Sequence, residues 1–248
     1  MFDSGVGGLT VLRELRRQLP DEATIYLGDE ARMPYGPREP AEVVSFTREA
    51  LRWFGRHGCK LVVIACNTAT AVALEAVRDE SAVPVIGVVR PGAAAALTAT
   101  ARRAVGVLGT TLTVRSGAYV RALRDLDPLV EAGKADTDEA EAAVREYVEP
   151  LLTEGAVVRP AVDTLLLGCT HYPFLRARIE KVAGAGVRVV DSATTTALAV
   201  REVLSSHRLV RGEKGALHEV HATGSRERFA AIARRLFGED VPVHETTL

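Results

Sequence analysis

Two cysteines occupy matching positions in two similar stretches of this chain. The apolar run Leu61–Ala65 leads into Cys66-Asn67-Thr68, and the apolar run Leu165–Gly168 leads into Cys169-Thr170-His171. Each run is typical of a buried strand, and open α/β sheets bind their ligands at the carboxyl ends of parallel strands. The repeated pattern therefore predicts one thiol from each half of a duplicated fold beside a single small molecule.

Two thiols on opposite faces of one carbon could invert a stereocentre without a cofactor. A single base tends to return a proton to the face from which it came, whereas a second acid can deliver one to the other face. A lone cysteine is most simply a small buried apolar residue, and we interpret Cys59 in that way. For Cys66 and Cys169 we expect a helix N-terminus to lower the thiol pKa from about 8.5 toward neutrality.

The glycine-rich loop Asp3-Ser4-Gly5-Val6-Gly7-Gly8 is a second candidate for chemistry. It lacks the G-x-G-x-x-G spacing of a dinucleotide site, and the chain contains no G-x-x-x-x-G-K-[ST] phosphate loop. It is either a tight turn with a capping carboxylate or a turn that presents Asp3 and Ser4 to a cleft. The loop alone leaves both interpretations open.

Among the histidines, His171 is the best placed for chemistry. It follows Cys169 by two residues, so it could hold or relay the proton of that thiol. His218 and His221 fall on opposite faces of a predicted strand and make a poor metal-binding pair. We therefore expect no metal site.

Strand and helix patterns alternate along the whole chain, which predicts parallel sheets covered by helices on both faces. The strands are expected at Ala23–Gly28, Leu61–Ala65, Val83–Val89, Ala104–Leu108, Thr164–Leu167, Val187–Asp191 and Leu217–Thr223. The helices are expected at Leu9–Leu19, Ala41–His57, Ala69–Arg78, Thr113–Leu126, Thr137–Leu152, Thr194–Leu204 and Glu227–Phe237. The strand at Val83–Val89 should end before Pro91.

The order of these elements indicates an internal duplication. The turn at Phe2–Gly5 corresponds to Leu108–Thr111, and each turn precedes its cysteine by a similar interval. We therefore predict an α/β fold with two pseudo-symmetric parallel-sheet domains and a site in the cleft between them. The expected domains are residues 1–91 plus 205–248, and residues 92–204. Two features break the symmetry: Met1-Phe2 looks too short for the strand expected before Asp3, and no strand is evident near Pro128.

Composition narrows the possible partners. Hydrophobic residues make up 47% of the chain, charged residues 25%, and the formal net charge is −1, so nothing favours nucleic acid or a membrane surface as a partner. No apolar run is long enough to span a membrane and no signal peptide is evident. Three cysteines argue against a disulfide framework and favour reduced thiols in the cytoplasm.

Several motifs together resemble the glutamate racemases of the cofactor-independent aspartate/glutamate racemase superfamily. They are Phe2–Val11, Pro34-Tyr35-Gly36, Cys66-Asn67-Thr68-Ala69, Gly168–Pro173, Val190–Ala193, and Thr223-Gly224 followed by Phe229. The resemblance covers nearly the whole chain, and the Asp-Ser-Gly opening favours glutamate over aspartate as the substrate.

The resemblance implies a role for each matching residue. Cys66 is expected to remove the α-proton of D-glutamate and Cys169 that of L-glutamate, assisted by Asp3 and His171 respectively, while Glu131 supports the histidine. The implied substrate contacts are Asp3, Ser4, Tyr35, Gly36, Asn67, Thr68, Thr170 and His171, with Asp29 a weaker candidate. No cofactor is expected, and no lysine stands in a loop suited to pyridoxal phosphate.

The resemblance also implies a biological context and leaves some alternatives open. It points to a cytoplasmic enzyme that supplies D-glutamate for peptidoglycan, and it is compatible with a homodimer. One alternative is a related enzyme acting on aspartate or another small acid, or a one-thiol decarboxylase. Another is a hydrolase or acyltransferase that uses Cys169 and His171 and leaves Cys66 without a role. A third is a small-molecule-binding module without catalysis.

Overall fold

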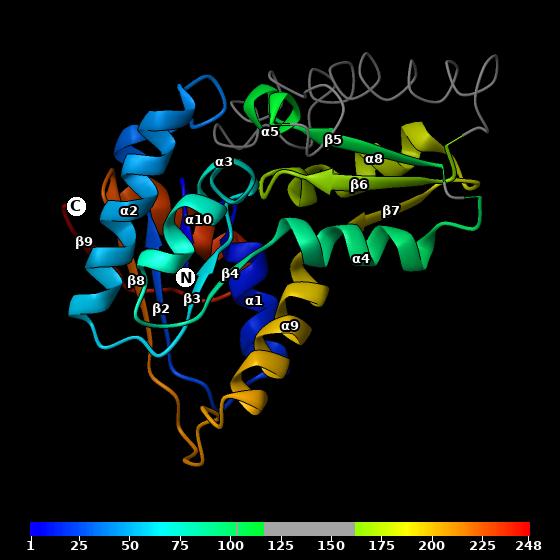
Figure 1. The fold of residues 1–248 in the computed structure, drawn as a ribbon. Helices are drawn as coiled ribbons and strands as arrows, with labels where there is room; N and C mark the ends of the chain where they lie inside the picture. The colour runs from blue at the N-terminus through cyan, green and yellow to red at the C-terminus, as the bar shows by residue number, and fades with distance from the viewer. Residues whose placement is uncertain (103, 117–161) are drawn as a thin grey trace.

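The computed structural model describes residues 1–102, 104–116 and 162–248, and these residues form two parallel sheets (Figure 1). The larger sheet has the strand order β4-β3-β1-β2-β8-β9 and the smaller sheet the order β5-β6-β7. We call the larger sheet with its covering helices the first unit, and the smaller sheet with its covering helices the second unit. The fold class predicted from the sequence, α/β with two parallel-sheet units, is confirmed.

The strands of the first unit are β1 (Phe2–Asp3), β2 (Thr24–Gly28), β3 (Val62–Ile64), β4 (Val85–Gly87), β8 (His218–Ala222) and β9 (Val243–Glu245). Those of the second unit are β5 (Val105–Gly109), β6 (Thr164–Gly168) and β7 (Arg188–Asp191). The α-helices are α1 (Leu9–Gln18), α2 (Pro40–Arg56), α3 (Asn67–Val77), α4 (Val89–Ala99), α5 (Thr111–Arg115), α8 (Arg176–Ala183), α9 (Ala193–Ser206) and α10 (Arg226–Phe237). Short 3-10 helices are η1 (Glu30–Arg32), η2 (Arg78–Glu80) and η3 (Tyr172–Leu175).

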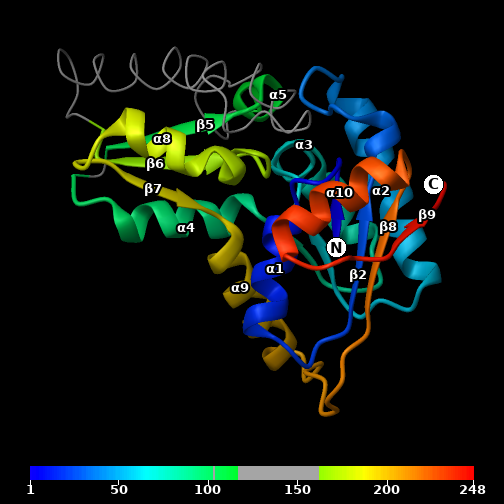
Figure 2. The same cartoon turned by 180° about the vertical axis from the view of Figure 1, so that it is seen from behind.

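The period of two along β3 divides its side chains between two apolar cores. Val63 and Ala65 pack in a core with residues of α1, α9 and α10, whereas Val62, Ile64 and Cys66 pack in a core with residues of α2 and α3. The first sheet is therefore buried on both faces, as Figures 1 and 2 show from opposite sides. Cys66 continues the face of the strand that points toward α2 and α3.

The second sheet repeats this arrangement. Leu165, Leu167 and Cys169 share a buried cluster with Ile179 of α8, and α4 covers the other face. Leu166 points toward α4, because a Cβ added at Gly92 would lie 3.5 Å from its side chain. Each cysteine therefore lies on the same face as the residue two positions before it in its strand: Cys66 with Ile64, and Cys169 with Leu167.

The carboxyl-terminal segment returns to the first unit. β8 pairs in parallel with β2 from Thr24↔His218 to Gly28↔Ala222, and β9 adds a further strand at the edge (Figure 2). α10 begins at Ser225, whose side chain accepts a hydrogen bond from the Arg228 backbone N–H and caps the helix. The domain boundaries given above stay a prediction.

The structure corrects two expectations about elements. Met1-Phe2 looked too short for a strand, yet Phe2 and Asp3 form β1 in the middle of the sheet, because Phe2 pairs with Leu27 on one side and Ile64 on the other. The predicted strand at Val83–Val89 is only β4, and α4 begins at Val89 with Pro91 inside its first turn. A proline is tolerated there because the first N–H groups of a helix have no intrahelical acceptor.

Several predictions made from the sequence concern residues that the structure does not describe. The predicted helix at Thr113–Leu126 begins as α5 at Thr111, and its later part, the helix at Thr137–Leu152, Glu131 and the stretch near Pro128 are not described. The sequence prediction also overlooked α4, α8 and β9. Among the described residues, no helix is long and apolar enough to cross a membrane.

Candidate functional site

Cys66 lies at the junction between β3 and α3. It is the N-cap residue of α3, and its sulfur accepts a hydrogen bond from the Ala69 backbone N–H over 3.4 Å. The thiol also donates to Ser4 Oγ over 3.5 Å, which links it to the turn after β1. The residue is only 4% exposed, so its sulfur is held in a fixed, largely dry position.

Burial raises the pKa of the Cys66 thiol to about 11, and the negative charge of Asp3 is the second cause. Hydrogen bonding with Ser4 and with the Ala69 N–H at the start of α3 lowers the pKa of the thiol, but by less than burial and Asp3 raise it. The expectation that the helix N-terminus lowers the pKa of Cys66 is therefore wrong. Desolvation destabilises the thiolate more than the N-terminus of α3 stabilises it.

Asp3 ends β1 and is completely buried. One of its oxygens accepts the Gly5 N–H over 3.1 Å, and the other accepts the Thr170 hydroxyl over 3.2 Å. Burial raises the pKa of this carboxyl, and the charge of His171 is the strongest of the influences that lower it. Asp3 therefore lies within electrostatic reach of both Cys66 and His171.

Cys169 follows β6 as Cys66 follows β3. Its sulfur lies 3.7 Å from Nδ1 of His171, and both residues are buried. The Tyr172 N–H donates to the Cys169 carbonyl over 3.3 Å, which closes the turn into η3. This tight turn brings the thiol and the imidazole to the same end of the second sheet.

The turn after β1 joins the surroundings of the two cysteines. Besides the Thr170–Asp3 hydrogen bond, Gly7 approaches Thr170 so closely that an added Cβ would lie 2.3 Å from the Thr170 hydroxyl oxygen. The turn that contacts Cys66 through Ser4 is thus in direct contact with the residue next to Cys169. The structure brings the predicted residues Asp3, Ser4, Cys66, Cys169, Thr170 and His171 into one buried group.

Three threonine hydroxyls form a second contact between the units. Thr68 Oγ1 lies 2.9 Å from Thr110 Oγ1, and Thr113 Oγ1 lies 2.8 Å from Thr110 Oγ1 and 3.2 Å from Thr68 Oγ1. The sequence prediction included Thr68 and missed the other two. A signal was present, because the internal duplication aligns Ser4 with Thr110. Asn67 is buried beside Thr68 in the first turn of α3.

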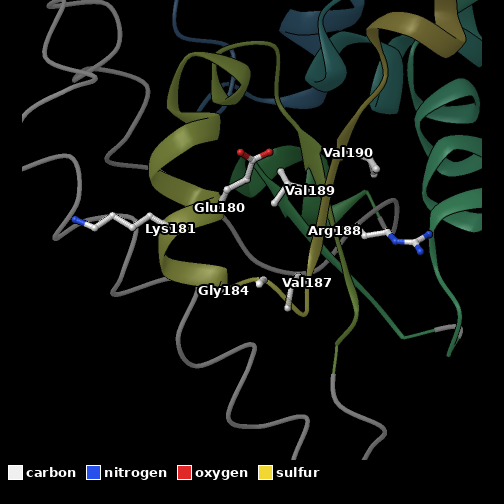
Figure 3. A pocket seen from close by; sticks show the side chains of 8 residues that line it. Glu180, Lys181, Gly184, Val187, Arg188, Val189 and Val190 are labelled. Carbon is white, nitrogen blue, oxygen red and sulfur yellow. The ribbon is translucent and has the colours of Figure 1, made fainter.

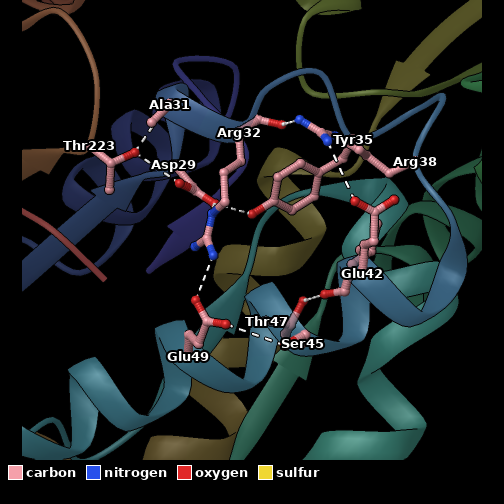
Figure 4. A network of polar contacts seen from close by, with 11 residues as sticks. Asp29, Ala31, Arg32, Tyr35, Arg38, Glu42, Ser45, Thr47, Glu49 and Thr223 are labelled. Atoms are coloured by element: carbon pink, nitrogen blue, oxygen red, sulfur yellow. Dashed lines mark hydrogen bonds and ion pairs between the residues drawn. The ribbon is translucent and has the colours of Figure 1, made fainter.

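Tyr35 and Gly36 lie in the loop between η1 and α2. Tyr35 is buried, and its hydroxyl donates to the Asp29 carboxylate (Figure 4). Gly36 faces the second unit, since a Cβ added there would lie 3.1 Å from Cβ of Thr110. Asp29 itself is completely buried and accepts hydrogen bonds from three protein donors, Arg32, Tyr35 and Thr223; the substrate contact considered for it from the sequence stays a prediction.

Neither thiol lines either of two other hollows in the structure. One is an open depression of about 720 Å³ between the end of α8 and β7, where Lys181 and Arg188 extend away from each other (Figure 3). The other is a cavity of about 310 Å³ beneath the start of β1, lined by residues that include Met1, Leu15 and Cys59. The described residues contain no cluster of three or more histidine, cysteine or acidic side chains that could hold a metal ion.

The arrangement provides acid–base groups and hydrogen-bond donors from both units. Two thiols, one carboxyl and one imidazole can exchange protons, and the threonine hydroxyls and the N-termini of α3 and α5 can bind a carboxylate. Such a site suits proton transfer at a carbon next to a carboxylate.

Comparison with known proteins agrees with this chemistry. The family model of the Asp/Glu/Hydantoin racemases matches residues 7–200. The chain is 42% identical to a glutamate racemase of Oceanobacillus iheyensis, over 96% of this chain and 91% of the relative. Its fold is similar to that of a glutamate racemase isoform from Bacillus anthracis, with a TM-score of 0.93, 37% identity and coverage of 100% and 96% of the two chains. It is also similar to a glutamate racemase from Francisella tularensis solved in complex with D-glutamate, with a TM-score of 0.88, 27% identity and coverage of 99% and 95%.

Proposed function

This chain belongs to the Asp/Glu/hydantoin racemase family and, within it, to the glutamate racemases, and we propose that it interconverts L- and D-glutamate with Cys66 and Cys169 as its two acid–base groups. The observation that carries the proposal is the hydrogen bond from Thr170, next to Cys169, to Asp3, whose neighbour Ser4 contacts the thiol of Cys66. It supports a site in which one thiol from each unit faces the same substrate carbon.

In this proposal, Cys66 removes the α-proton of D-glutamate and Cys169 protonates the opposite face to give L-glutamate. The reverse reaction exchanges the two roles, so one thiol must start as thiolate and the other as thiol. Asp3 assists Cys66, and His171, at 3.7 Å from the sulfur, assists Cys169. Glu131, which lies outside the described residues, would support His171, as the sequence resemblance implies.

The raised pKa values of Cys66 and Asp3 fit a site that ionises only when substrate enters. In the ligand-free site, burial raises the pKa of both groups, and the negative charge of Asp3 raises that of Cys66 further. The α-ammonium group of glutamate brings a positive charge that offsets the charge of Asp3 and makes a thiolate less costly. The substrate thus creates the base that acts on it.

The negative charge that develops at the α-carbon spreads into the α-carboxylate. Hydroxyl groups and helix N-termini aimed at this carboxylate stabilise the charge most strongly when water is excluded. Ser4, Asn67, Thr68 and Thr170 are the proposed contacts, together with the Tyr35–Gly36 loop. These groups supply the stabilisation that pyridoxal phosphate gives in other racemases, so the proposal needs no cofactor.

We further propose, from the resemblance, that the product D-glutamate serves peptidoglycan synthesis in the cytoplasm and that the substrate is the enzyme's main partner. A homodimer is compatible with this role.

Single alanine variants of the two cysteines test the mechanism. We expect Cys66→Ala and Cys169→Ala each to lower kcat by about 10³-fold or more, because neither thiol alone can serve both faces. Circular dichroism of L-glutamate, D-glutamate and L-aspartate, each with enzyme, measures the turnover and the substrate preference. Full turnover by either variant would rule out the two-thiol mechanism, and faster inversion of aspartate would reject glutamate as the substrate.

Exchange of the α-hydrogen in D2O tests which thiol serves which enantiomer. Wild-type enzyme should place deuterium at the α-carbon of the inverted product. Any exchange that survives should be confined to L-glutamate in Cys66→Ala and to D-glutamate in Cys169→Ala, since only one face keeps its base. NMR of the recovered enantiomers reads this out, and the opposite pattern would reverse the assignment.

A further inference from the structure

We propose that Asp29 is a positioning residue for the reaction: it holds the Tyr35–Gly36 loop against the site, and the carboxyl-terminal segment holds Asp29 through Thr223. This inference rests on the proposed function only in taking that loop as part of the substrate site. The residues involved come from two distant parts of the chain, residues 29–49 and Thr223, and meet in one network of polar contacts (Figure 4).

Asp29 follows β2 directly and is completely buried. Its Oδ1 accepts the Thr223 hydroxyl over 2.8 Å. Its Oδ2 accepts the Nε–H of Arg32 over 2.6 Å and also the hydroxyl of Tyr35. Because the carboxylate is completely buried and both of its oxygens accept from protein donors, its proposed action is on the geometry of its neighbours.

Arg32 balances the charge of Asp29 and is itself held in place. Its Nη1 donates to Glu49 of α2 over 2.5 Å, and its guanidinium carbon lies 4.2 Å from the ring centre of Phe46. A buried carboxylate is tolerated when it is paired and hydrogen-bonded in this way. The pair therefore anchors the end of β2 to α2, on either side of the loop.

Tyr35 is fixed at both ends of its side chain. Its hydroxyl is tied to Asp29, and its ring packs between Phe2, at 6.3 Å, and Phe46, at 5.5 Å between ring centres. The ring belongs to the same buried cluster as Cys66. Burial and Asp29 raise the pKa of Tyr35, so the phenol stays a neutral hydrogen-bond donor.

The position of Tyr35 decides where Gly36 lies. Gly36 sits against Thr110 of the second unit, with no room for a side chain larger than hydrogen unless Thr110 gives way. Thr110 in turn bonds with Thr68. A shift of the loop would therefore disturb the substrate contacts proposed on both units and open a path to Cys66.

The carboxyl-terminal segment completes the support. The Thr223 hydroxyl accepts the Ala31 N–H over 3.1 Å while it donates to Asp29, and the Thr223 N–H donates to the Gly28 carbonyl over 3.0 Å. Phe229 packs against the backbone of Gly28, where an added Cβ would lie 2.5 Å from its ring. This explains why a segment so late in the chain matters to a loop near its start.

The experiment uses three variants that each remove one connection: Asp29→Asn, Tyr35→Phe and Thr223→Val. Glu80→Gln is the matched control. Like Asp29→Asn it removes a carboxylate that binds an arginine, but that arginine is Arg48 of α2, away from the loop. Two properties are measured: KM and kcat for both enantiomers of glutamate, and the rates at which iodoacetamide alkylates each cysteine, followed by mass spectrometry.

We expect Asp29→Asn to raise KM about tenfold with kcat within about threefold, because binding geometry is lost while the acid–base groups stay. Alkylation of Cys66 should become several times faster, and that of Cys169, which lies in another cluster, should keep its wild-type rate. Tyr35→Phe and Thr223→Val should shift both quantities in the same direction by less. Glu80→Gln should match the wild type.

Wild-type KM and alkylation rates in all three variants would overturn the proposal. An equal rise at Cys66 and Cys169 would do so as well, since it would indicate general loosening of the fold. If Asp29→Asn fails to fold, the other two variants carry the test. The alkylation comparison needs no substrate, so it still judges the role of Asp29 if the wild type fails to racemise glutamate and the proposed function falls.

Discussion

Cys66 and Asp3 are two neighbouring buried acidic groups, and the negative charge of Asp3 disfavours ionisation of the Cys66 thiol. Burial raises the pKa of both groups, and the negative charge of Asp3 is the second reason why the pKa of Cys66 reaches about 11. The ligand-free pair therefore favours at most one negative charge. A buried thiol with a raised pKa is also less susceptible to oxidation, because the thiolate is the reactive form.

The substitution Asp3→Asn tests this coupling in the ligand-free protein. Removing the negative charge should lower the pKa of Cys66, although burial still keeps it above its ordinary value. At a fixed pH of about 8, iodoacetamide should then alkylate Cys66 about 3- to 10-fold faster, since the rate follows the thiolate fraction. The midpoint of the rate against pH should move down from about 11.

Cys59 is the internal control for this measurement. It is half-buried, and Asp3 is not among the causes of its raised pKa, so its alkylation rate should not change. An unchanged or slower reaction at Cys66 would show that the charge of Asp3 does not govern the thiol.

At the scale of single residues, the sequence predicts more of the site than of its electrostatics. Cys66 and Cys169 are found from their repeated position after apolar strands, and His171 from its spacing to Cys169. The raised pKa of Cys66 cannot be read in the same way, because it depends on how completely the folded chain buries the thiol and on the nearby charge of Asp3. Thr110 and Thr113 could not be predicted as site residues for a related reason. Their contact with Thr68 forms only when the two units come together.

At the scale of elements, close packing of turns positions the site. The turn before α1 and the turn after β6 touch at Gly7 and Thr170, where even the backbone carbon of Thr170 would lie 2.8 Å from an added Cβ. Rotation of a side chain cannot relieve a contact with backbone. The register between the units therefore depends on the absence of a side chain at position 7.

The pair Gly7→Ala and Gly55→Ala tests this view. Gly7→Ala should lower the free energy of unfolding by about 1–3 kcal/mol through overpacking and lower kcat/KM for glutamate at least about tenfold, because Thr170 moves away from Asp3. Gly55 lies in α2 with nothing within 4 Å of an added Cβ, so Gly55→Ala should raise the free energy of unfolding by up to about 1 kcal/mol. Urea titration and steady-state kinetics measure both. Equal stability of the two variants would contradict the close contact at Gly7.

The sequence predicts the elements with clear local signals and misses those without them. α1 and α2 carry apolar residues at helical spacing and, in α2, a proline start with a Glu39–Glu42 capping box, so local signals define them. β1 has two residues and β9 three, too few for a pattern, and each exists because a neighbouring strand supplies its partners. Pro91 misled the prediction because proline has opposite meanings inside a helix and in its first turn.

At the scale of the whole molecule, the two units are joined at the site itself. Thr170 bonds to Asp3 on one side, and Thr68 contacts Thr110 and Thr113 on the other, so hydroxyl groups link the units around the thiols. The return of the chain through β8, α10 and β9 to the first sheet places both termini on the first unit (Figure 2). Among the described residues, the chain passes from the first sheet to the second between β4 and β5 and returns between β7 and β8.

A double-mutant cycle on Thr68 and Thr110 tests whether the units stay in contact without substrate. Thr68→Val and Thr110→Val should each destabilise the protein, and their combined effect should fall short of the sum by about 0.5–1.5 kcal/mol, because either change alone breaks the same bond. The matched control is a second cycle that pairs Thr68→Val with Thr47→Val. The Thr47 hydroxyl donates to the Val43 carbonyl within α2, so the two effects in this cycle should add to within about 0.5 kcal/mol. Denaturant unfolding without and with glutamate measures both cycles. A coupling near zero in the free protein that rises when glutamate is added would mean that the units close only around the substrate, and the contact seen between them would then belong to the bound state.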